Sequence, residues 1–372
     1  MPKKPAPKKA SAPPPAAEPP ALRMPAEWEP HAATWIAWPH NKDDWPGRFA
    51  PVPWVYAEIV RKLHVGERVA IVVLDDDHRR DARKKLRRAG VDLGRVDFHG
   101  FPTDRVWTRD TGPVFVVDRG GGLQANHWVF NGWAKYDDHK ADRKLGARIA
   151  KAVGVPVREP THAGRRIVLE GGSIDVNGAG CLLTTEECLL SEIQQRNPGM
   201  TRADYESAFA GNLGVRKTIW LNRGVAGDDT HGHVDDLARF VDPTTVVVVQ
   251  ESDESDDNFV PLRENWERLS GMTDQDGRRL TVVALPMPRP VVFDGQRLPA
   301  SYANFYIGNS VVLVPTFNDP ADRVALGILA DLFPTRTVTG IHCVELVWGL
   351  GTLHCMTQQQ PAADGDATSS GR

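Results

Sequence analysis

Cys355 is the residue of this chain whose surroundings most strongly indicate chemistry. It lies in residues 349–358, a segment of small and polar residues that offers little to a hydrophobic core. Residues 107–113, 169–172 and 228–236 have the same character, and they supply carboxylates and imidazoles next to glycine. A thiol is a nucleophile once ionised, and carboxylates attract cations. The four segments together therefore predict covalent catalysis on a cationic electrophile.

The other three cysteines have a different setting. A free cysteine is more often a small buried hydrophobic residue than a nucleophile. Cys181, Cys188 and Cys343 each stand beside an apolar residue, whereas Cys355 has glycine and threonine around it. We therefore predict that the first three are structural and that Cys355 is reactive. No CxxC pair occurs, and a disulfide scaffold is unusual in a chain of 372 residues, which favours a reducing compartment and a cytoplasmic location.

The His-Gly-His-Val-Asp-Asp loop that begins at His231 allows three interpretations. The first is a zinc-dependent hydrolase with His231, His233 and Asp235 as ligands, although the two-zinc motif that it resembles has histidine at the position of Asp236. The second is a polar loop that caps a helix, with its acidic residues in the first turn. The third is an imidazole acid/base beside a carboxylate that binds substrate. Only the third gives the loop a function together with the reactive thiol.

Asp110 and Glu170 are two further carboxylates that indicate a function only when they are considered together with other residues. Asp110 lies in Trp-Thr-Arg-Asp-Thr-Gly-Pro, a composition typical of a turn. Glu170 follows the apolar residues 167–169 and is there either a cap or a group that orients a histidine. Each residue taken alone is explained by a structural role. Taken with Cys355 and His233, the two match one catalytic constellation.

Composition and charge limit the remaining possibilities. The chain is 41% hydrophobic and 25% charged, as globular proteins are, and its net charge of −3 gives no basic field for nucleic acid. No segment is long and apolar enough to cross a membrane, and the Pro-, Ala- and Lys-rich N-terminus lacks the apolar run of a signal peptide. We expect a disordered arm over residues 1–22, a single catalytic domain over 23–361 and a disordered tail over 362–372.

Strand-like and helix-like segments alternate along the chain, which predicts an α/β fold. The expected helices are residues 53–64, 77–89, 138–153, 202–210, 258–269 and 320–333. The expected strands are residues 68–74, 95–101, 124–130, 166–175, 180–184, 218–221, 244–249, 280–285 and 309–315, with a turn at Asn177-Gly178. No GxGxxG follows a strand and no GxxxxGK[ST] loop occurs, so no nucleotide cofactor is expected.

Motifs spread over most of the chain give it a family resemblance. They are MPAEWEPH, WIAWPHN, WTRDTGP, FNGWAKY, LEGGSIDVNG, RNPG, GDDTHGHVDD, YANFYIGN, PTFNDP and LHCMTQQQP, in this order between Met24 and Pro361. On these motifs the chain resembles the agmatine deiminases, members of the bacterial-type peptidyl-arginine deiminase family within the guanidine-modifying pentein superfamily. Two departures are the run of residues 349–353 before the cysteine and His231, where many relatives have aspartate. The resemblance implies a five-fold pseudo-symmetric propeller of ββαβ units around a central active site.

The resemblance also implies a reaction. Agmatine and water would give N-carbamoylputrescine and ammonia, a step of putrescine (polyamine) biosynthesis that uses no metal and no organic cofactor. The expected partner is a small guanidine substrate, with no nucleic acid and no membrane, and a homo-oligomer is compatible with the sequence.

The same resemblance assigns roles to individual residues. Cys355 is the expected nucleophile, which forms a thiouronium intermediate, His233 is the acid/base, and Glu170 orients that histidine. A guanidinium is planar and always cationic near neutral pH, so paired carboxylates can hold it. The residues assigned to substrate binding are Asp110, Asp235 and Trp107.

Other functions remain open from the sequence. Within the family, the substrate could be a peptidyl-arginine or another guanidine. From other classes, metal analysis distinguishes the zinc-dependent hydrolase, and a substituted catalytic residue, which is not seen, would signal a non-catalytic binding relative. We expect agmatine to be preferred over arginine, because carboxylates around the site would repel the carboxylate of arginine. Arg109, the obvious cation that could receive it, is expected instead to form a salt bridge that positions the loop of Asp110.

Overall fold

The structure is a computed structural model and describes residues 21–363. The arm expected over residues 1–22 and the tail expected over residues 362–372 lie outside this range, apart from two residues of each. No helix within the described range is long and apolar enough to cross a membrane.

Five sheets of the described chain repeat one pattern of strand pairing. In each, a central strand pairs with one neighbour antiparallel and with the other parallel. With the central strand in the middle, these sets are β21 (Gln358–Pro361), β2 (His31–Ala37) and β3 (Arg68–Val73); β5 (Val114–Asp118), β6 (Leu123–Asn126) and β7 (Val157–Arg158); β10 (Asp175–Val176), β11 (Cys181–Thr185) and β12 (Lys217–Leu221); β13 (Ala238–Phe240), β14 (Thr245–Gln250) and β15 (Thr281–Pro286); β18 (Tyr306–Ile307), β19 (Val311–Thr316) and β20 (Thr337–His342).

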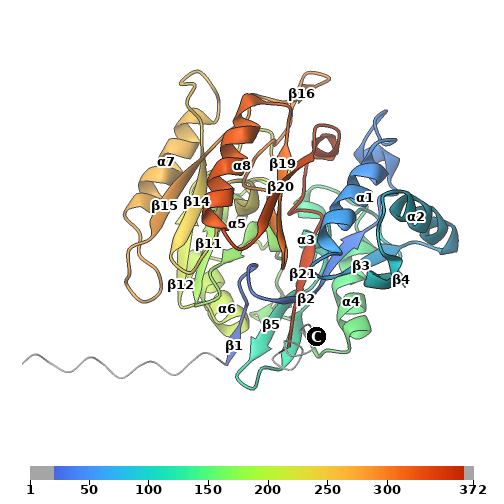
Figure 1. Cartoon of the computed structure of the whole chain (residues 1–372). Coiled ribbons are helices and arrows are strands. Elements are labelled where there is room, and N and C mark those ends of the chain that lie inside the picture. Colours follow the sequence, from blue (N-terminus) through green and yellow to red (C-terminus); the bar gives the residue numbers. More distant parts are fainter. Residues whose placement is uncertain (1–20, 364–372) are drawn as a thin grey trace, which may run out of the picture.

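Shorter strands complete the sheets. β1 (Leu22–Arg23) pairs with β5, and β4 (Val96–Gly100) pairs with β3. Two separate hairpins are formed by β8 (Thr161–His162) with β9 (Arg165–Arg166) and by β16 (Val292–Phe293) with β17 (Gln296–Arg297). Because β21 near the C-terminus pairs with β2 near the N-terminus, the two ends of the described chain close on one another (Figure 1).

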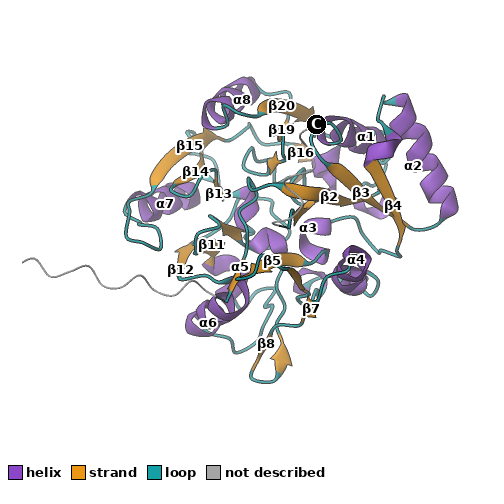
Figure 2. Cartoon of the chain, turned by 60° about the horizontal axis from the view of Figure 1, so that its bottom comes forward, coloured by secondary structure: helices purple, strands orange, loops and turns teal. Residues whose placement is uncertain are grey.

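Helices connect the parallel strands of each set, because parallel neighbours require a long crossover. These helices are α1 (Val52–Leu63), α4 (Leu145–Val153), α5 (Glu186–Leu190) with α6 (Arg202–Leu213), α7 (Phe259–Ser270) and α8 (Pro320–Leu332), and α2 (Asp76–Arg88) leads from β3 to β4. Figure 2 shows α1, α4, α6, α7 and α8 at the periphery with the strands nearer the middle. The apolar faces of the helices therefore pack inward on the sheets, where the main hydrophobic core lies.

Local sequence explains the elements that were predicted. The valine run of β14 is buried over Thr245–Val249, as expected for a strand covered on both faces. Asp319 caps α8 by accepting a hydrogen bond from the backbone of Ala321, and Pro320 fits the first turn because no helical partner exists there for a backbone N–H. The predicted α/β class is confirmed, and most predicted elements appear close to their expected positions.

Two predicted elements were wrong in detail. Residues 166–175 do not form one strand, because the two glycines of the short 3-10 turn η5 (Gly171–Ser173) separate β9 from β10. The helix expected from residue 138 becomes α-helical only at Leu145. The predicted turn at Asn177-Gly178 is present, and Gly178 has the positive φ of 69° that glycine tolerates best.

The four chemically marked segments come together at one place. α3 (Thr108–Thr111) contacts η5, and η5 contacts the 3-10 turn η6 (Val234–Asp236). The segment between the 3-10 turn η7 (Leu346–Gly349) and β21 carries Cys355, whose carbonyl oxygen accepts a hydrogen bond of 3.1 Å from the backbone nitrogen of Arg109. Residues more than 200 positions apart in sequence thus share one site.

Candidate active site

Cys355 lines a cavity of about 340 Å³. Trp107, Asp110 and Trp133 line the same cavity. The thiol is 7% exposed, and its sulfur accepts a hydrogen bond of 3.2 Å from Asn304 Nδ2. Of the predicted residues, Trp107 and Asp110 therefore share the cavity wall with the thiol.

Two carboxylates affect the ionisation of Cys355 most strongly. Asp235 Oδ2 is 3.6 Å from the sulfur and accepts the thiol hydrogen. Burial raises the pKa of the Cys355 thiol well above its usual value, and the charges of Asp235 and then Asp236 raise it further. The thiol therefore keeps its proton near neutral pH, and a cation beside it would favour the thiolate.

Asp110 is held in one orientation by two donors. Its Oδ1 accepts from the backbone nitrogen of Gly172 at 2.9 Å, and its Oδ2 accepts from Trp133 Nε1 at 2.8 Å. Burial raises the pKa of Asp110 to about 6; attraction from His233 opposes this shift, and repulsion from Asp235 adds to it. The carboxylate is thus oriented but easily neutralised, as expected for a group that gains its counter-charge from a ligand.

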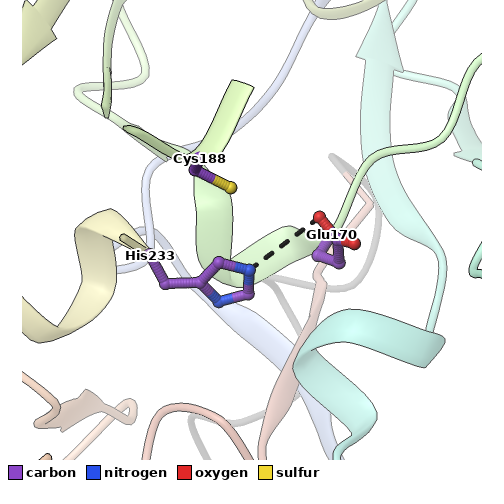
Figure 3. A group of neighbouring side chains, drawn as sticks. All are labelled: Glu170, Cys188 and His233. Atoms are coloured by element: carbon purple, nitrogen blue, oxygen red, sulfur yellow. Dashed lines mark ion pairs between the residues drawn. The ribbon is translucent and has the colours of Figure 1, made fainter. Parts of the chain in front are cut away.

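The imidazole of His233 lies among carboxylates without a hydrogen bond to any of them. Its Nδ1 is 3.9 Å from Asp110 Oδ2 and 4.0 Å from Asp235 Oδ1, and its Nε2 is 3.8 Å from Glu170 Oε2 (Figure 3). Burial lowers the pKa of His233, but Asp110, Cys188 and Glu170 outweigh it, and the pKa lies well above its usual value. The buried ring can therefore carry a proton.

The orientation of Glu170 is fixed by Arg196, an arginine to which the sequence analysis assigned no role. Arg196 Nε donates to Glu170 Oε1 at 3.1 Å, and both side chains are fully buried. Burial raises the pKa of Glu170, yet the charges of Arg196 and His233 lower it to about 2. Glu170 is therefore an ionised group facing His233. Arg196 belongs to the motif Arg-Asn-Pro-Gly, but the position of this motif in the sequence does not indicate that Glu170 is the partner of Arg196.

Cys188 was expected to be an inert buried cysteine. It is buried, but its sulfur lies close to Glu170 and His233, with the ligand atoms of the three within 4.8 Å of one another (Figure 3). Its apolar neighbours in sequence gave no sign of this position, because α5 brings it to the site only through the fold.

Asp235 is connected to two residues that sequence reasoning missed. Its Oδ2 accepts a hydrogen bond of 2.7 Å from His354 Nδ1, and His354 Nε2 in turn donates at 2.9 Å to Glu27 Oε2. Burial raises the pKa of Asp235, but the hydrogen bond and charge of His354 outweigh it, so the pKa is lowered. Asn304 holds the same segment, because its Oδ1 accepts from Thr352 Oγ1 at 2.7 Å.

Several polar atoms at the centre of the site have no partner within the described part of the chain. They are Glu170 Oε2, His233 Nδ1, His233 Nε2 and Asp235 Oδ1, and all are buried. Leaving such atoms unpaired costs about 1–3 kcal/mol each, so a native site of this kind is built for a ligand that pairs with them. The ligand must offer N–H or O–H donors to the carboxylates.

Glycine at position 172 keeps the centre of the site open. A Cβ there would lie 2.6 Å from His233 Nδ1, 2.9 Å from Asp110 Oδ1 and 3.1 Å from Asp235 Oδ2. Real Cβ atoms do not approach so closely, so any other residue would displace these groups. Gly351 has a similar role, because its Cβ would lie 2.8 Å from the ring of Trp107.

The predicted alternative zinc ligands are not assembled. His231 has a φ of 65°, and its Nε2 is 3.1 Å from Ser191 Oγ. Two groups of metal-type ligand atoms occur between residues 21 and 363, namely Glu170, Cys188 and His233, and Asp235, Asp236 and Cys355. His231 belongs to neither group, so His231, His233 and Asp235 do not form one ligand set.

Arg109 has the expected structural contacts. It is 3% exposed, and its Nη2 donates to Glu27 Oε2 at 2.9 Å while its Nη1 donates to Gln359 Oε1 at 2.7 Å. The prediction of a salt bridge that positions the loop of Asp110 is confirmed. A second arginine, Arg105, does line the cavity, but it is paired with Asp44 and Asp138.

This α/β scaffold, with a thiol, an imidazole and carboxylates around one cavity, is typical of enzymes with a cysteine nucleophile. The family model of the Porphyromonas-type peptidyl-arginine deiminases matches residues 23–361, and the chain belongs to that family.

Individual relatives agree with this assignment. The agmatine deiminase of Pseudomonas fluorescens is 36% identical over 91% of this chain and 95% of its own length. Among solved structures, the agmatine deiminase of Enterococcus faecalis has a TM-score of 0.85 at 31% identity, covering 92% of this chain and 96% of its own. A putative arginine deiminase from Porphyromonas gingivalis has a TM-score of 0.81 at 34% identity, covering 92% and 99%. The resemblance to the agmatine deiminases is therefore confirmed.

Proposed function

We propose that this chain is an agmatine deiminase, a hydrolase that acts on a C–N bond of a linear amidine. Agmatine and water are converted to N-carbamoylputrescine and ammonia, which would place the enzyme in putrescine biosynthesis. The observation that carries the proposal is the cluster of buried, unpaired carboxylate and imidazole atoms next to Asp110 and Cys355, which both line one cavity. Curated relatives named agmatine deiminase over nearly the full chain support it.

A guanidinium fits the donors and acceptors of this cluster. It is planar, permanently cationic and rich in N–H donors, and carboxylates bind it by charge-assisted hydrogen bonds. Asp110 and Asp235 hold the guanidinium in this proposal, and Trp107 covers it from the cavity wall. Glu170 Oε2 and Asp235 Oδ1 are unpaired acceptors, so they require a ligand that donates hydrogen bonds. They therefore favour a cation over an anion.

Substrate binding prepares the nucleophile. The guanidinium brings a positive charge next to Cys355 and lowers the pKa that burial and carboxylates had raised. Asn304 donates to the sulfur and stabilises the thiolate. The sulfur then forms a bond to the central guanidinium carbon.

His233 moves the protons of both halves of the reaction. It gives its proton to the nitrogen that leaves as ammonia, and the carbon remains attached to Cys355 as a thiouronium. His233 then takes a proton from water, whose oxygen bonds to the same carbon. The C–S bond breaks, the proton of the new hydroxyl passes to the Cys355 sulfur and restores the thiol, and N-carbamoylputrescine leaves. Glu170 keeps the imidazole oriented and stabilises its protonated form, as in other nucleophile–histidine–carboxylate sites.

The outer cavity supports an amine rather than a carboxylate at the far end of the substrate. Its wall includes several acidic side chains, and its arginine is already paired. The acidic residues are Asp43, Asp44, Asp138 and Asp229, and they outnumber their cationic partners, because Asp44 and Asp138 share Arg105 and Asp229 pairs with Lys135. Agmatine ends in an ammonium group, whereas arginine adds a carboxylate that this wall would repel.

The architecture completes the proposal. The five repeated sheets would form five pseudo-symmetric ββαβ units around the site, and residues 23–361 would be one catalytic domain. The reaction described above uses only side chains and water, so neither a metal nor an organic cofactor is required.

Ammonia release from a panel of guanidines tests the function. Purified protein is given agmatine, free arginine, an arginine-containing peptide and guanidine analogues at several concentrations, and the product is identified by mass. We expect kcat/KM to be highest for agmatine and to survive exhaustive chelation. A higher value for arginine or the peptide would show that the substrate assignment is wrong. The zinc-dependent hydrolase would be supported instead if the protein bound stoichiometric zinc, lost activity when the zinc was removed and regained it when the zinc was returned.

A further inference from the structure

His354, the residue before Cys355, takes no part in the chemistry described above, yet both of its ring nitrogens are hydrogen-bonded. Nδ1 lies 2.7 Å from Asp235 Oδ2, and Nε2 lies 2.9 Å from Glu27 Oε2. The side chain is 2% exposed, so solvent does not compete for these contacts. His354 is thus a buried bridge between a carboxylate of the site and one behind it.

The two carboxylates that His354 bridges, those of Glu27 and Asp235, are both held in the ionised form. Burial raises the pKa of Glu27, but the charges of Arg239, His354 and Arg109 outweigh it and hold the pKa well below its usual value. Asp235 is also held in its ionised form, as described above. Ionised carboxylates only accept hydrogen bonds, so both ring nitrogens of His354 must donate. The ring is therefore held between two carboxylates.

Glu27 anchors the bridge because its acceptor positions are filled. Besides His354, its Oε2 accepts from Arg109 Nη2 at 2.9 Å. Its Oε1 accepts from Arg239 Nη2 at 2.9 Å and from the backbone nitrogen of Ile307 at 2.9 Å. Four donors from distant parts of the chain fix this carboxylate, so the ring attached to it has little freedom to turn.

The fixed ring determines how Asp235 meets a ligand. Oδ2 of Asp235 is taken up by His354 and lies 3.6 Å from the sulfur of Cys355, whereas Oδ1 is buried and unpaired. Without the ring, the carboxylate could turn about its side-chain bond, and its oxygen near the thiol would lose its hydrogen-bond donor.

We propose that His354 is a positioning residue: its ring, anchored on Glu27, holds the Asp235 carboxylate so that Oδ1 is free for the guanidinium of the substrate. The proposal rests on the deiminase function proposed above.

Two conservative variants separate the two hydrogen bonds. In His354→Asn the side-chain amide can take the place of Nδ1 and donate to Asp235, whereas in His354→Gln the amide can take the place of Nε2 and reach only Glu27. We expect His354→Gln to lose about 10- to 100-fold in kcat/KM, mainly through KM, as removal of a hydrogen bond to a charged group implies. His354→Asn should retain the larger part of the activity.

Binding and control measurements sharpen the comparison. Agmatine binding is measured calorimetrically in a Cys355→Ala background, where we expect the His354→Gln change to weaken binding by a similar factor. His342→Asn is the matched control, because His342 is exposed and contacts only Glu345, at 3.0 Å. Thermal melting of each variant reports any loss of stability separately.

The outcomes distinguish this inference from the function on which it rests. If the wild type turns over agmatine but both His354 variants keep the wild-type KM and differ only in melting temperature, the ring is merely structural and the inference is wrong. Equal losses in the two variants would also contradict it. If the wild type acts on no guanidine, the proposed function itself has failed. A crystal structure of the wild type with agmatine bound must show Asp235 Oδ1 on the guanidinium while Oδ2 keeps its hydrogen bond to His354 Nδ1, and the absence of this arrangement would overturn the proposal whether or not the variants fold.

Discussion

The indole nitrogen of Trp133 donates a hydrogen bond of 2.8 Å to Asp110 Oδ2, although the two residues lie on different elements of the chain. Trp133 has a φ of 56°, a strained value for a bulky residue, and its ring packs edge-on against Phe130 at 4.9 Å. The strained backbone is thus accompanied by a ring that both lines the cavity and orients a carboxylate.

Replacing Trp133 by phenylalanine tests this orientation. The variant keeps an aromatic wall but loses the donor to Asp110, so we expect KM for agmatine to rise about tenfold with a smaller effect on kcat. Trp128→Phe is the control, because its indole nitrogen is buried without a partner and its loss breaks no hydrogen bond. Steady-state kinetics of the two variants decide the matter, and equal KM values would refute the role of the indole nitrogen.

Gly172→Ala should inactivate the enzyme without unfolding it. The added methyl would lie 2.6 Å from His233 Nδ1 and 2.9 Å from Asp110 Oδ1, and a displacement of this kind can cost about 100-fold in rate. Gly211→Ala in α6 meets no atom within 4 Å and should stabilise the helix by about 1 kcal/mol with normal activity. Activity assays with thermal melting compare them. A fully active Gly172→Ala enzyme would contradict the site geometry.

The pH profile of kcat/KM should have an acid limb near pH 6. The pKa of Asp110 is raised to about 6, so its carboxylate gains a proton as the pH falls through that value and can no longer attract the guanidinium. In the complex the substrate cation favours the ionised form, so the acid limb of kcat should lie at lower pH. Asp110→Asn should remove the limb together with most of the affinity. A limb unchanged in this variant would assign it to another group.

Cys355→Ala should abolish turnover, because no other thiol lines the cavity. Cys343→Ala and Cys181→Ala are matched controls, since both cysteines are buried away from that cavity and should cost only stability. Cys188→Ala is not a neutral control, because the sulfur of Cys188 is a neighbour of His233. Mass spectrometry of the wild-type enzyme quenched during turnover should show the adduct on the peptide of Cys355. Full activity of Cys355→Ala would exclude the covalent mechanism.

His233→Ala should lose far more activity than His231→Ala. Acid/base groups contribute about 10²–10⁴-fold, and the ring of His233 lies among Asp110, Asp235 and Glu170, whereas that of His231 contacts Ser191. Single-turnover rates of the two variants provide the comparison. Equal losses at the two positions would leave the acid/base unassigned and would favour a metal site again.

The amino-acid sequence by itself determined the class of the fold. Alternating apolar runs and amphipathic segments predict strands and helices because their periodicity depends only on local geometry, as α1, β14 and α8 illustrate. The sequence also separated Cys355 from the other cysteines by its polar neighbours, and ordered motifs indicated the family.

Only the tertiary structure decided which side chains act on one another. Glu27 and His354 are more than 300 residues apart, yet the fold joins Glu27 through His354 to Asp235. Cys188 looks like any buried cysteine in sequence, yet the fold places it beside His233. The sequence marks Arg196 only as part of a motif, and the structure shows that its partner is Glu170. Hydrogen bonds and charge interactions act over a few ångströms in space and leave no periodic pattern along the chain, so the site needed the folded protein, whereas the elements that carry it did not.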